Sequence, residues 1–335
     1  MLDLVYALVL TDHRSSPLYA VYHRRGGSVK ILVTGAAGFI GSALVVALAA
    51  RHPRARVVAF DVVPSDAAQV MIGDLSDPGV AASLVDGETT HIFHLASLVS
   101  GGAEADFERG TRINLDATRE LLEAARHHGG APTFVFASSI AVYGGELPEI
   151  ITDATPPLPR LSYGAQKLVC EVLINDYTRR GFIDGRSLRL PTVMVRPGAA
   201  NTAVSGWASA IIREPLAGRD YVCPVGPHTR MACLSLNRAV EAFTHAAALP
   251  ADAFGHDRSL LLTGIPVTAQ QMIDAVQRVG AGRKLGALRF APDVQMQAIM
   301  DGVARGTRSE RAARLGFRSS ASIDDIVADY AATVK

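Results

Sequence analysis

Tyr163 and Lys167 stand four positions apart in the stretch SYGAQK, in a chain that hardly uses lysine. Of its 33 basic residues only four are lysines, and the others are arginines. A tyrosine has a pKa of about 10 and is a base near neutral pH only when that pKa is lowered. A compact ammonium one helical turn away lowers it. Taken alone, the pair is explained equally well by an exposed helix lysine, so proton abstraction from an alcohol needs support from the rest of the chain.

A glycine-rich turn follows the first apolar run, in the stretch VTGAAGFIG. Gly35 permits a tight turn, Gly38 lets the backbone approach a pyrophosphate, and Gly41 lets helix and strand pack closely. The N-terminus of the following helix attracts phosphate charge. The spacing therefore predicts a dinucleotide site, with Phe39 and Ile40 among the residues that contact the cofactor.

An acidic residue marks the end of the second expected strand. Asp61 comes 20 residues after Gly41, and residues 62–65 contain no arginine. A carboxylate here accepts hydrogen bonds from the ribose hydroxyls of adenosine and repels a 2′-phosphate. The alternative is a turn former at a strand end. The spacing favours a cofactor-binding role for Asp61 and predicts that the cofactor is NAD rather than NADP.

From Val29 onward, short β-branched runs alternate with alanine- and leucine-rich helical stretches. This rhythm predicts an α/β fold, a Rossmann-type doubly wound parallel sheet with a small C-terminal substrate-binding lobe. Among the expected elements are a long helix over 105–128 and a strand over 187–195. The expected division is a poorly packed N-terminal extension at 1–28, an NAD-binding domain at 29–190 to which 234–264 return, and a substrate-binding lobe made of 191–233 and 265–335.

Composition narrows the class of protein. The 335 residues are 49% hydrophobic and 19% charged with a net charge of +1, which indicates a sizeable core and neither a nucleic-acid nor a membrane partner. The three cysteines, Cys170, Cys223 and Cys233, lack CxxC spacing. We therefore expect a cytoplasmic protein without a metal site.

The stretches FVFASSIAVYG and SYGAQK, together with the glycine motif, resemble the extended short-chain dehydrogenase/reductase family, also known as the NAD-dependent epimerase/dehydratase family. The resemblance implies a catalytic triad of Ser139, Tyr163 and Lys167, in which Ser139 holds the substrate oxygen. It implies further cofactor contacts from Asp74 and Leu75 beside the adenine, Leu95, Ala96 and Ser97 along the cofactor, Asn114 supporting Lys167 through a water, and Pro191. His94, just before the cofactor loop, is expected to be a hydrogen-bonded core histidine.

A closer resemblance, over residues 94–119, 177–198 and 208–218, is to a branch of that family that oxidises the C2 hydroxyl of a four-carbon sugar acid with NAD. It implies a small-molecule substrate and a homodimer. An arginine suits the carboxylate because it binds in a bidentate manner. The candidate substrate residues are Ser100, Gly101, Ser139, Asn201, Arg213 and Arg230.

Two alternatives stay open. A nucleotide-sugar epimerase or dehydratase, such as UDP-glucose 4-epimerase, shares the fold, NAD and the triad. Such relatives carry an acidic, aromatic run after the substrate arginine, whereas MACLSLN follows Arg230 here. A non-catalytic NAD-sensing regulator tends to lose the tyrosine or the lysine, and this chain keeps both.

Overall fold

The computed structural model describes residues 29–66, 68–198 and 204–334, so the expected extension at 1–28 and the candidate Asn201 lie outside the described residues. Its main sheet has seven strands in the order β3-β2-β1-β4-β5-β6-β10, and neighbouring strands are parallel. This order is the doubly wound arrangement that the sequence predicts. The strands are β1 (Lys30–Thr34), β2 (Arg56–Asp61), β3 (Val70–Ile72), β4 (Thr89–His94), β5 (Thr133–Ser139), β6 (Asp184–Leu190) and β10 (Ser259–Leu261).

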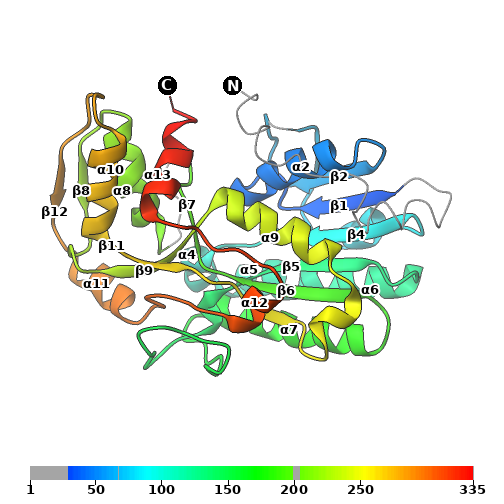
Figure 1. The fold of residues 1–335 in the computed structure, drawn as a ribbon. Helices are drawn as coiled ribbons and strands as arrows, with labels where there is room; N and C mark the ends of the chain where they lie inside the picture. Colours follow the sequence, from blue (N-terminus) through cyan, green and yellow to red (C-terminus); the bar gives the residue numbers. More distant parts are fainter. Residues whose placement is uncertain (1–28, 67, 199–203, 335) are drawn as a thin grey trace.

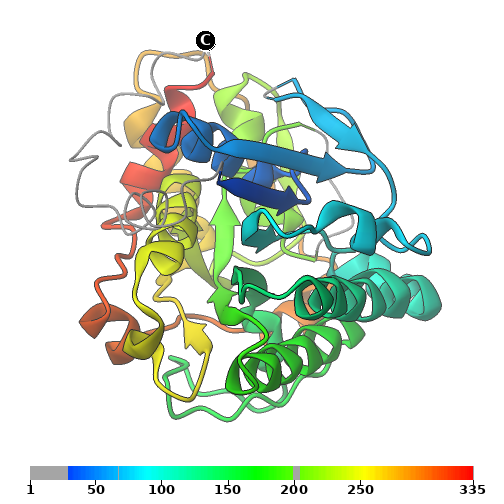
Figure 2. The ribbon, with the colours of Figure 1, turned by 90° about the vertical axis from the view of Figure 1, so that its right-hand side faces the viewer.

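Helices cover both faces of this sheet (Figure 1). On one face α2 (Phe39–Arg51) and α9 (Leu236–Ala248) bury Leu44, Leu48 and Phe243 against the strands. On the other, α6 (Ala117–His128) and α7 (Ser162–Arg179) lie side by side (Figure 2) and share a second core cluster. Each fully buried side chain of this size contributes about 1.5–3 kcal/mol. Shorter elements of this part are α3 (Val80–Leu84), α4 (Ser100–Ala105), α5 (Phe107–Thr111) and the 3₁₀ turns η2 (Ile140–Val142) and η3 (Ala251–Phe254).

A smaller body with its own apolar core lies beside the carboxyl ends of the main-sheet strands, on the left of Figure 1. It contains a three-stranded sheet, β11-β9-β7, and a two-stranded one, β12-β8. The segment expected to return to the main sheet supplies β10, which pairs with β6. The elements of the smaller body are β7 (Thr192–Met194), β8 (Tyr221–Cys223), β9 (Arg230–Ser235), β11 (Ile265–Thr268), β12 (Leu288–Phe290), α8 (Gly206–Leu216), α10 (Ala269–Val279), α11 (Val294–Asp301) and α13 (Ile323–Ala331), while α12 (Glu310–Arg314) packs near β10.

Two expected elements are divided in the structure. The single strand expected over 187–195 is two strands in different sheets, β6 and β7, with Pro191 between them. Proline has no N–H to donate to a ladder, so the chain leaves the main sheet there. The long helix expected over 105–128 is α5, a π-helical turn η1 (Arg112–Asp116) and α6. Both breaks lie near the carboxyl ends of the main-sheet strands, where the candidate residues gather.

Candidate active site

The glycine turn between β1 and α2 is built for close backbone approach. Gly35 has φ +71°, and a Cβ there would lie 2.6 Å from the Ala96 nitrogen. A Cβ at Gly41 would lie 2.0 Å from the Gly35 carbonyl oxygen. In the described chain no side chain caps α2 at Gly38, and its first turn holds no acid. The N-terminus of α2 is therefore free of acidic side chains that would repel a phosphate, and the residues present fit the pyrophosphate of a dinucleotide.

Asp61 ends β2 beside this turn. Its carboxylate accepts hydrogen bonds from the backbone N–H groups of Ala37, at 2.9 Å, and Val62, at 2.7 Å. A carboxylate has about four acceptor sites, so capacity remains for ribose hydroxyls. After the neighbouring strand β3, the side chain of Ser76 donates a hydrogen bond to Asp74 and lowers the pKa of that carboxyl. Leu75 beside it is buried. The structure thus places Asp61 at the glycine turn, and Asp74 and Leu75 just after the neighbouring strand β3; their contacts with adenosine stay predictions.

The π-helical turn η1 fixes Asn114 next to the cofactor loop. The Asn114 side-chain oxygen accepts from Ser97 Oγ at 3.0 Å and from the Leu98 N–H at 2.8 Å. Its amide nitrogen donates to the Leu98 carbonyl and to Gln166 Oε1. Single π turns in α-helices are frequent at functional sites. Asn114 therefore ties the loop after β4 to α7; its support of Lys167 through a water stays a prediction.

The predicted triad comes together at the carboxyl end of β5. Burial raises the pKa of Tyr163, while hydrogen bonds from Ser97 and Ser139 and the charge of Arg196 lower it. Ser139 Oγ accepts from the Ala141 N–H at 3.1 Å, so its own hydroxyl proton is the one that it donates toward Tyr163. From the sequence we expect the Lys167 ammonium to lower the pKa of Tyr163. In the structure that pKa is raised, because burial outweighs the contributions of Ser97, Ser139 and Arg196.

Lys167 is 1% exposed. Its Nζ lies 4.5 Å from the centroid of the Phe136 ring and 5.5 Å from that of Tyr163. Burial lowers the pKa of Lys167 to about 8, opposed by Cys170 and by the carboxylate of Glu171. The lysine is thus close enough to Tyr163 to act on it, and its charge depends on neighbouring acids.

His94 has the structural role that the sequence suggests. Its ring nitrogens are hydrogen-bonded to Thr34 Oγ1 at 2.7 Å and Thr118 Oγ1 at 2.8 Å, and the side chain is fully buried. Burial lowers its pKa to about 3, so the ring is neutral. His94 therefore belongs to the core beneath the site.

A buried ion pair that the sequence did not reveal lies behind the triad. Arg189 donates two hydrogen bonds to Glu171, from Nε at 3.0 Å and from Nη2 at 2.7 Å, and a third to the Tyr143 hydroxyl at 2.7 Å. Ser138 donates to the same carboxylate at 2.5 Å. The Glu171 side chain is 2% exposed. Its position four residues after Lys167, on the same helix face, is the signal that could have found it.

The predicted substrate residues are more dispersed. Ser100 and Gly101 begin α4, just after the cofactor loop. Arg213 is buried in α8, where Nε donates to Glu214 at 2.7 Å and Nη1 to the Arg196 carbonyl at 2.8 Å. The guanidinium of Arg213 is therefore hydrogen-bonded to groups of the protein itself, which the sequence did not predict. Direct contact with a substrate stays a prediction for all of these residues.

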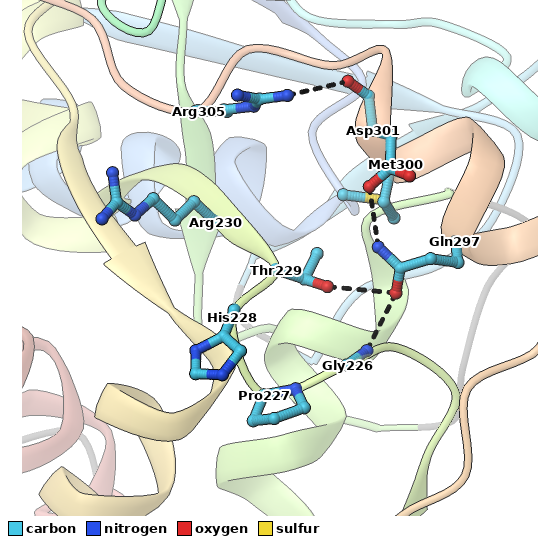
Figure 3. A pocket seen from close by; sticks show the side chains of 9 residues that line it. All are labelled: Gly226, Pro227, His228, Thr229, Arg230, Gln297, Met300, Asp301 and Arg305. Carbon is cyan, nitrogen blue, oxygen red and sulfur yellow. Dashed lines mark hydrogen bonds between the residues drawn. The ribbon is translucent and has the colours of Figure 1, made fainter.

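Arg230 lies at the rim of a pocket of about 410 Å³ in the smaller body (Figure 3). Its guanidinium pairs with Glu149 across to the loop that follows β5. On the opposite wall, Gln297 accepts from the Gly226 N–H and from Thr229, and donates to Asp301. The structure brings the triad and the cofactor residues together, and places Arg230 in this separate hollow.

Comparison with known proteins agrees with this geometry. Residues 31–247 match the model of the NAD dependent epimerase/dehydratase family. The chain belongs to this family. The family identity confirms the resemblance carried by the glycine motif and by SYGAQK, and with it the Rossmann-type fold.

Family members named D-erythronate dehydrogenase are similar over nearly their whole length. That of Cupriavidus necator is 44% identical over 316 residues, covering 90% of this chain and 98% of the relative. That of Haemophilus influenzae is 36% identical over 314 residues, with the same coverage. A solved structure from Agrobacterium tumefaciens, described as a nucleoside-diphosphate-sugar epimerase, is 38% identical with a TM-score of 0.83, covering 90% of this chain and 92% of that one. The similarity to dehydrogenases confirms the prediction of an NAD-dependent oxidoreductase.

Within the described ranges, none of the helices has the length and apolar character needed to cross a membrane.

Asp61 provides a test of cofactor choice. Replacing it by Ser should lower the ratio of kcat/KM for NAD over NADP about tenfold or more, because a carboxylate facing a 2′-phosphate costs several kcal/mol. Asp61→Asn is the matched variant. It also removes the charge but keeps an acceptor for the Ala37 N–H, so it separates the loss of charge from the loss of that hydrogen bond. Steady-state kinetics with both cofactors measure the ratio. Equal use of NAD and NADP by the wild type would contradict the assignment.

Glu171 provides a test of the buried pair. Because its charge raises the pKa of Lys167, Glu171→Gln should move the high-pH loss of kcat/KM, where the ammonium deprotonates, to lower pH. Removing one partner of a buried pair also costs about 3–5 kcal/mol of stability. Thermal unfolding and the pH profile measure the two effects.

The double variant Glu171→Gln/Arg189→Met separates these effects. It removes both charges, so it should recover part of the lost stability and keep the displaced pH profile. A folded Glu171→Gln enzyme with the wild-type profile would show that the pair is structural only.

Proposed function

We propose that the protein oxidises the C2 hydroxyl of D-erythronate to the 2-oxo acid with NAD, by a Ser-Tyr-Lys mechanism. The observation that carries the proposal is the near full-length similarity to two proteins named D-erythronate dehydrogenase. The grouping of Ser139, Tyr163 and Lys167 supports an alcohol oxidation.

Each member of the triad has a distinct role in this proposal. Tyr163 takes the proton of the substrate hydroxyl as the C2 hydride leaves. Ser139 orients the substrate oxygen. Its Oγ already accepts from Ala141, so its hydroxyl proton, directed at Tyr163 in the protein without substrate, turns to donate to the substrate oxygen. Lys167 stabilises the phenolate of Tyr163 electrostatically. NAD, when bound at the glycine turn, supplies the hydride acceptor and a positively charged ring. Ser100, Gly101 and Asn201 are the proposed partners of the remaining substrate hydroxyls.

A nucleotide-sugar epimerase is the second candidate, favoured by the description of the similar Agrobacterium structure. The two functions differ in their net chemistry. Oxidation of a sugar acid releases one NADH per turnover, whereas epimerisation returns the hydride to the substrate and leaves no net NADH.

The substrate test follows from that difference. Purified enzyme with NAD should form NADH with D-erythronate or a close four-carbon 2-hydroxy acid, and neither bind nor convert UDP-glucose or UDP-galactose. Epimerisation of a UDP-sugar, without a response to any sugar acid, would favour the second candidate.

Tyr163→Phe should abolish turnover and keep NAD affinity near the wild-type value, because only the base is removed.

We also propose a cytoplasmic homodimer that buries the exposed face of α5 and α7. Three apolar side chains on this face are largely exposed, Phe107 at 66%, Val169 at 45% and Val172 at 63%. Exposed apolar groups that cluster on neighbouring helices are typical of protein–protein interfaces.

A charge at this face tests the dimer. Val172→Asp should shift the mass measured by light scattering from about twice 35.4 kDa to 35.4 kDa, since burying an unpaired carboxylate in an interface is unfavourable. Val294→Asp is the control, because Val294 is 84% exposed on α11, in the smaller body. A monomeric wild type would refute the proposal.

A further inference from the structure

Arg196 occupies a central position that no motif predicted. It follows β7 closely, and its guanidinium carbon lies 5.9 Å from the centroid of the Phe39 ring at the start of α2. It also acts electrostatically on Tyr163, as the opposing effects on their two pKa values show. The guanidinium therefore lies beside Phe39 at the glycine turn, close enough to the catalytic tyrosine for their charges to interact.

The backbone of Arg196 is fixed by α8. Its N–H donates to Ser209 Oγ at 3.0 Å, and its carbonyl accepts from Arg213 Nη1 at 2.8 Å. Arg213 is in turn held by Glu214. Arg213 thus contributes to the site by holding the backbone of Arg196. Such buried bonds place a side chain precisely, as recognition of a small ligand requires.

The substrate chemistry sets a distance requirement. In a 2-hydroxy acid the carboxylate is bonded to the carbon that carries the reacting hydroxyl. When that hydroxyl is hydrogen-bonded to Tyr163, a carboxylate oxygen lies within roughly 5–6 Å of the tyrosine oxygen. A cation that binds this carboxylate must therefore stand next to Tyr163.

Arg230 is poorly placed for this task. Strand β7 pairs with β9 so that Met194 is opposite Ser235, and Arg230 is five residues earlier on β9. At about 3.3 Å per residue, it lies roughly 16 Å along the strand from the end that leads to Arg196. Its guanidinium is also paired with Glu149.

We propose that Arg196 binds the carboxylate of the substrate and thereby selects 2-hydroxy acids over neutral alcohols. This inference rests on the proposed function and deepens it. Arg196 is partly buried, and burial lowers its pKa, so its charge is incompletely hydrated. An anionic partner compensates such a charge, and a planar guanidinium binds a carboxylate with two parallel hydrogen bonds.

The test compares an acid with its amide. Arg196→Gln should raise KM for D-erythronate at least tenfold, and change KM for D-erythronamide less than twofold, because the amide carries no charge. Arg196→Lys should restore part of the affinity for the acid, since it keeps the charge and loses the bidentate geometry. Arg278→Gln is the control, an exposed arginine on α10 paired with Asp324, and should match wild type with both substrates.

Two further measurements exclude other roles of Arg196. The Kd of NAD, from fluorescence titration, should stay within twofold in Arg196→Gln; a large rise would mean that the arginine holds the cofactor. The pH profile of kcat should move to higher pH by the same amount with acid and amide, because the charge of Arg196 lowers the pKa of Tyr163 whichever substrate is bound. An equal rise of KM with acid and amide would mean that Arg196 acts only through Tyr163 and would overturn the proposal.

The outcome for the proposed function is separate. It fails when the wild type does not oxidise D-erythronate, and the comparison is then made with whichever carboxylic acid the wild type oxidises and with the amide of that acid. A wild type that oxidises only alcohols without a carboxylate would overturn both proposals. Wild-type turnover of D-erythronate with no selective effect of Arg196→Gln would overturn the role of Arg196 alone.

Discussion

The ion pair between Glu171 and Arg189 is the interaction on which the site depends. It joins β5, through Ser138, to β6 and to α7, and these three elements carry Ser139, the chain leading to Pro191, and the tyrosine–lysine pair. Buried charges cost several kcal/mol each to desolvate, so such a pair adds little net stability and its value lies in geometry. With three donors to Glu171 and one bond to Tyr143, the network permits few other arrangements of the strand ends and helix.

The same pair contributes to the electrostatics around Tyr163. On a chain whose net charge is only +1, Lys167 lies near the Tyr163 ring and the charge of Arg196 also acts on the tyrosine. His94 adds no charge, because burial keeps its ring neutral. Glu171 supports the ammonium from one turn further along α7. Burial raises the pKa of the phenol more than the chain's own groups lower it. The positive charges therefore oppose the effect of burial in part, and they favour an anionic substrate.

Much of the fold and of the cofactor site could be predicted because both depend on local constraints. The turn at Gly35 leaves no space for a Cβ, and β-branched runs alternating with helices leave few arrangements other than a parallel sheet. The π turn around Asn114 could not be predicted, because its residues are ordinary for a helix and the turn forms through tertiary bonds to Leu98 and Gln166. The break at Pro191 was readable from proline chemistry but was obscured by the apolar residues on both sides.

The arginines show why substrate residues are harder to predict than cofactor residues. In sequence, Arg196, Arg213 and Arg230 are alike, and a carboxylate partner could be any of them. Their roles diverge only through contacts made in three dimensions: Arg213 bonds to a backbone carbonyl, Arg230 pairs with Glu149 in the loop after β5, and Arg196 lies beside Phe39 at the glycine turn. Proteins that share one fold can therefore differ in substrate through the contacts of a few arginines.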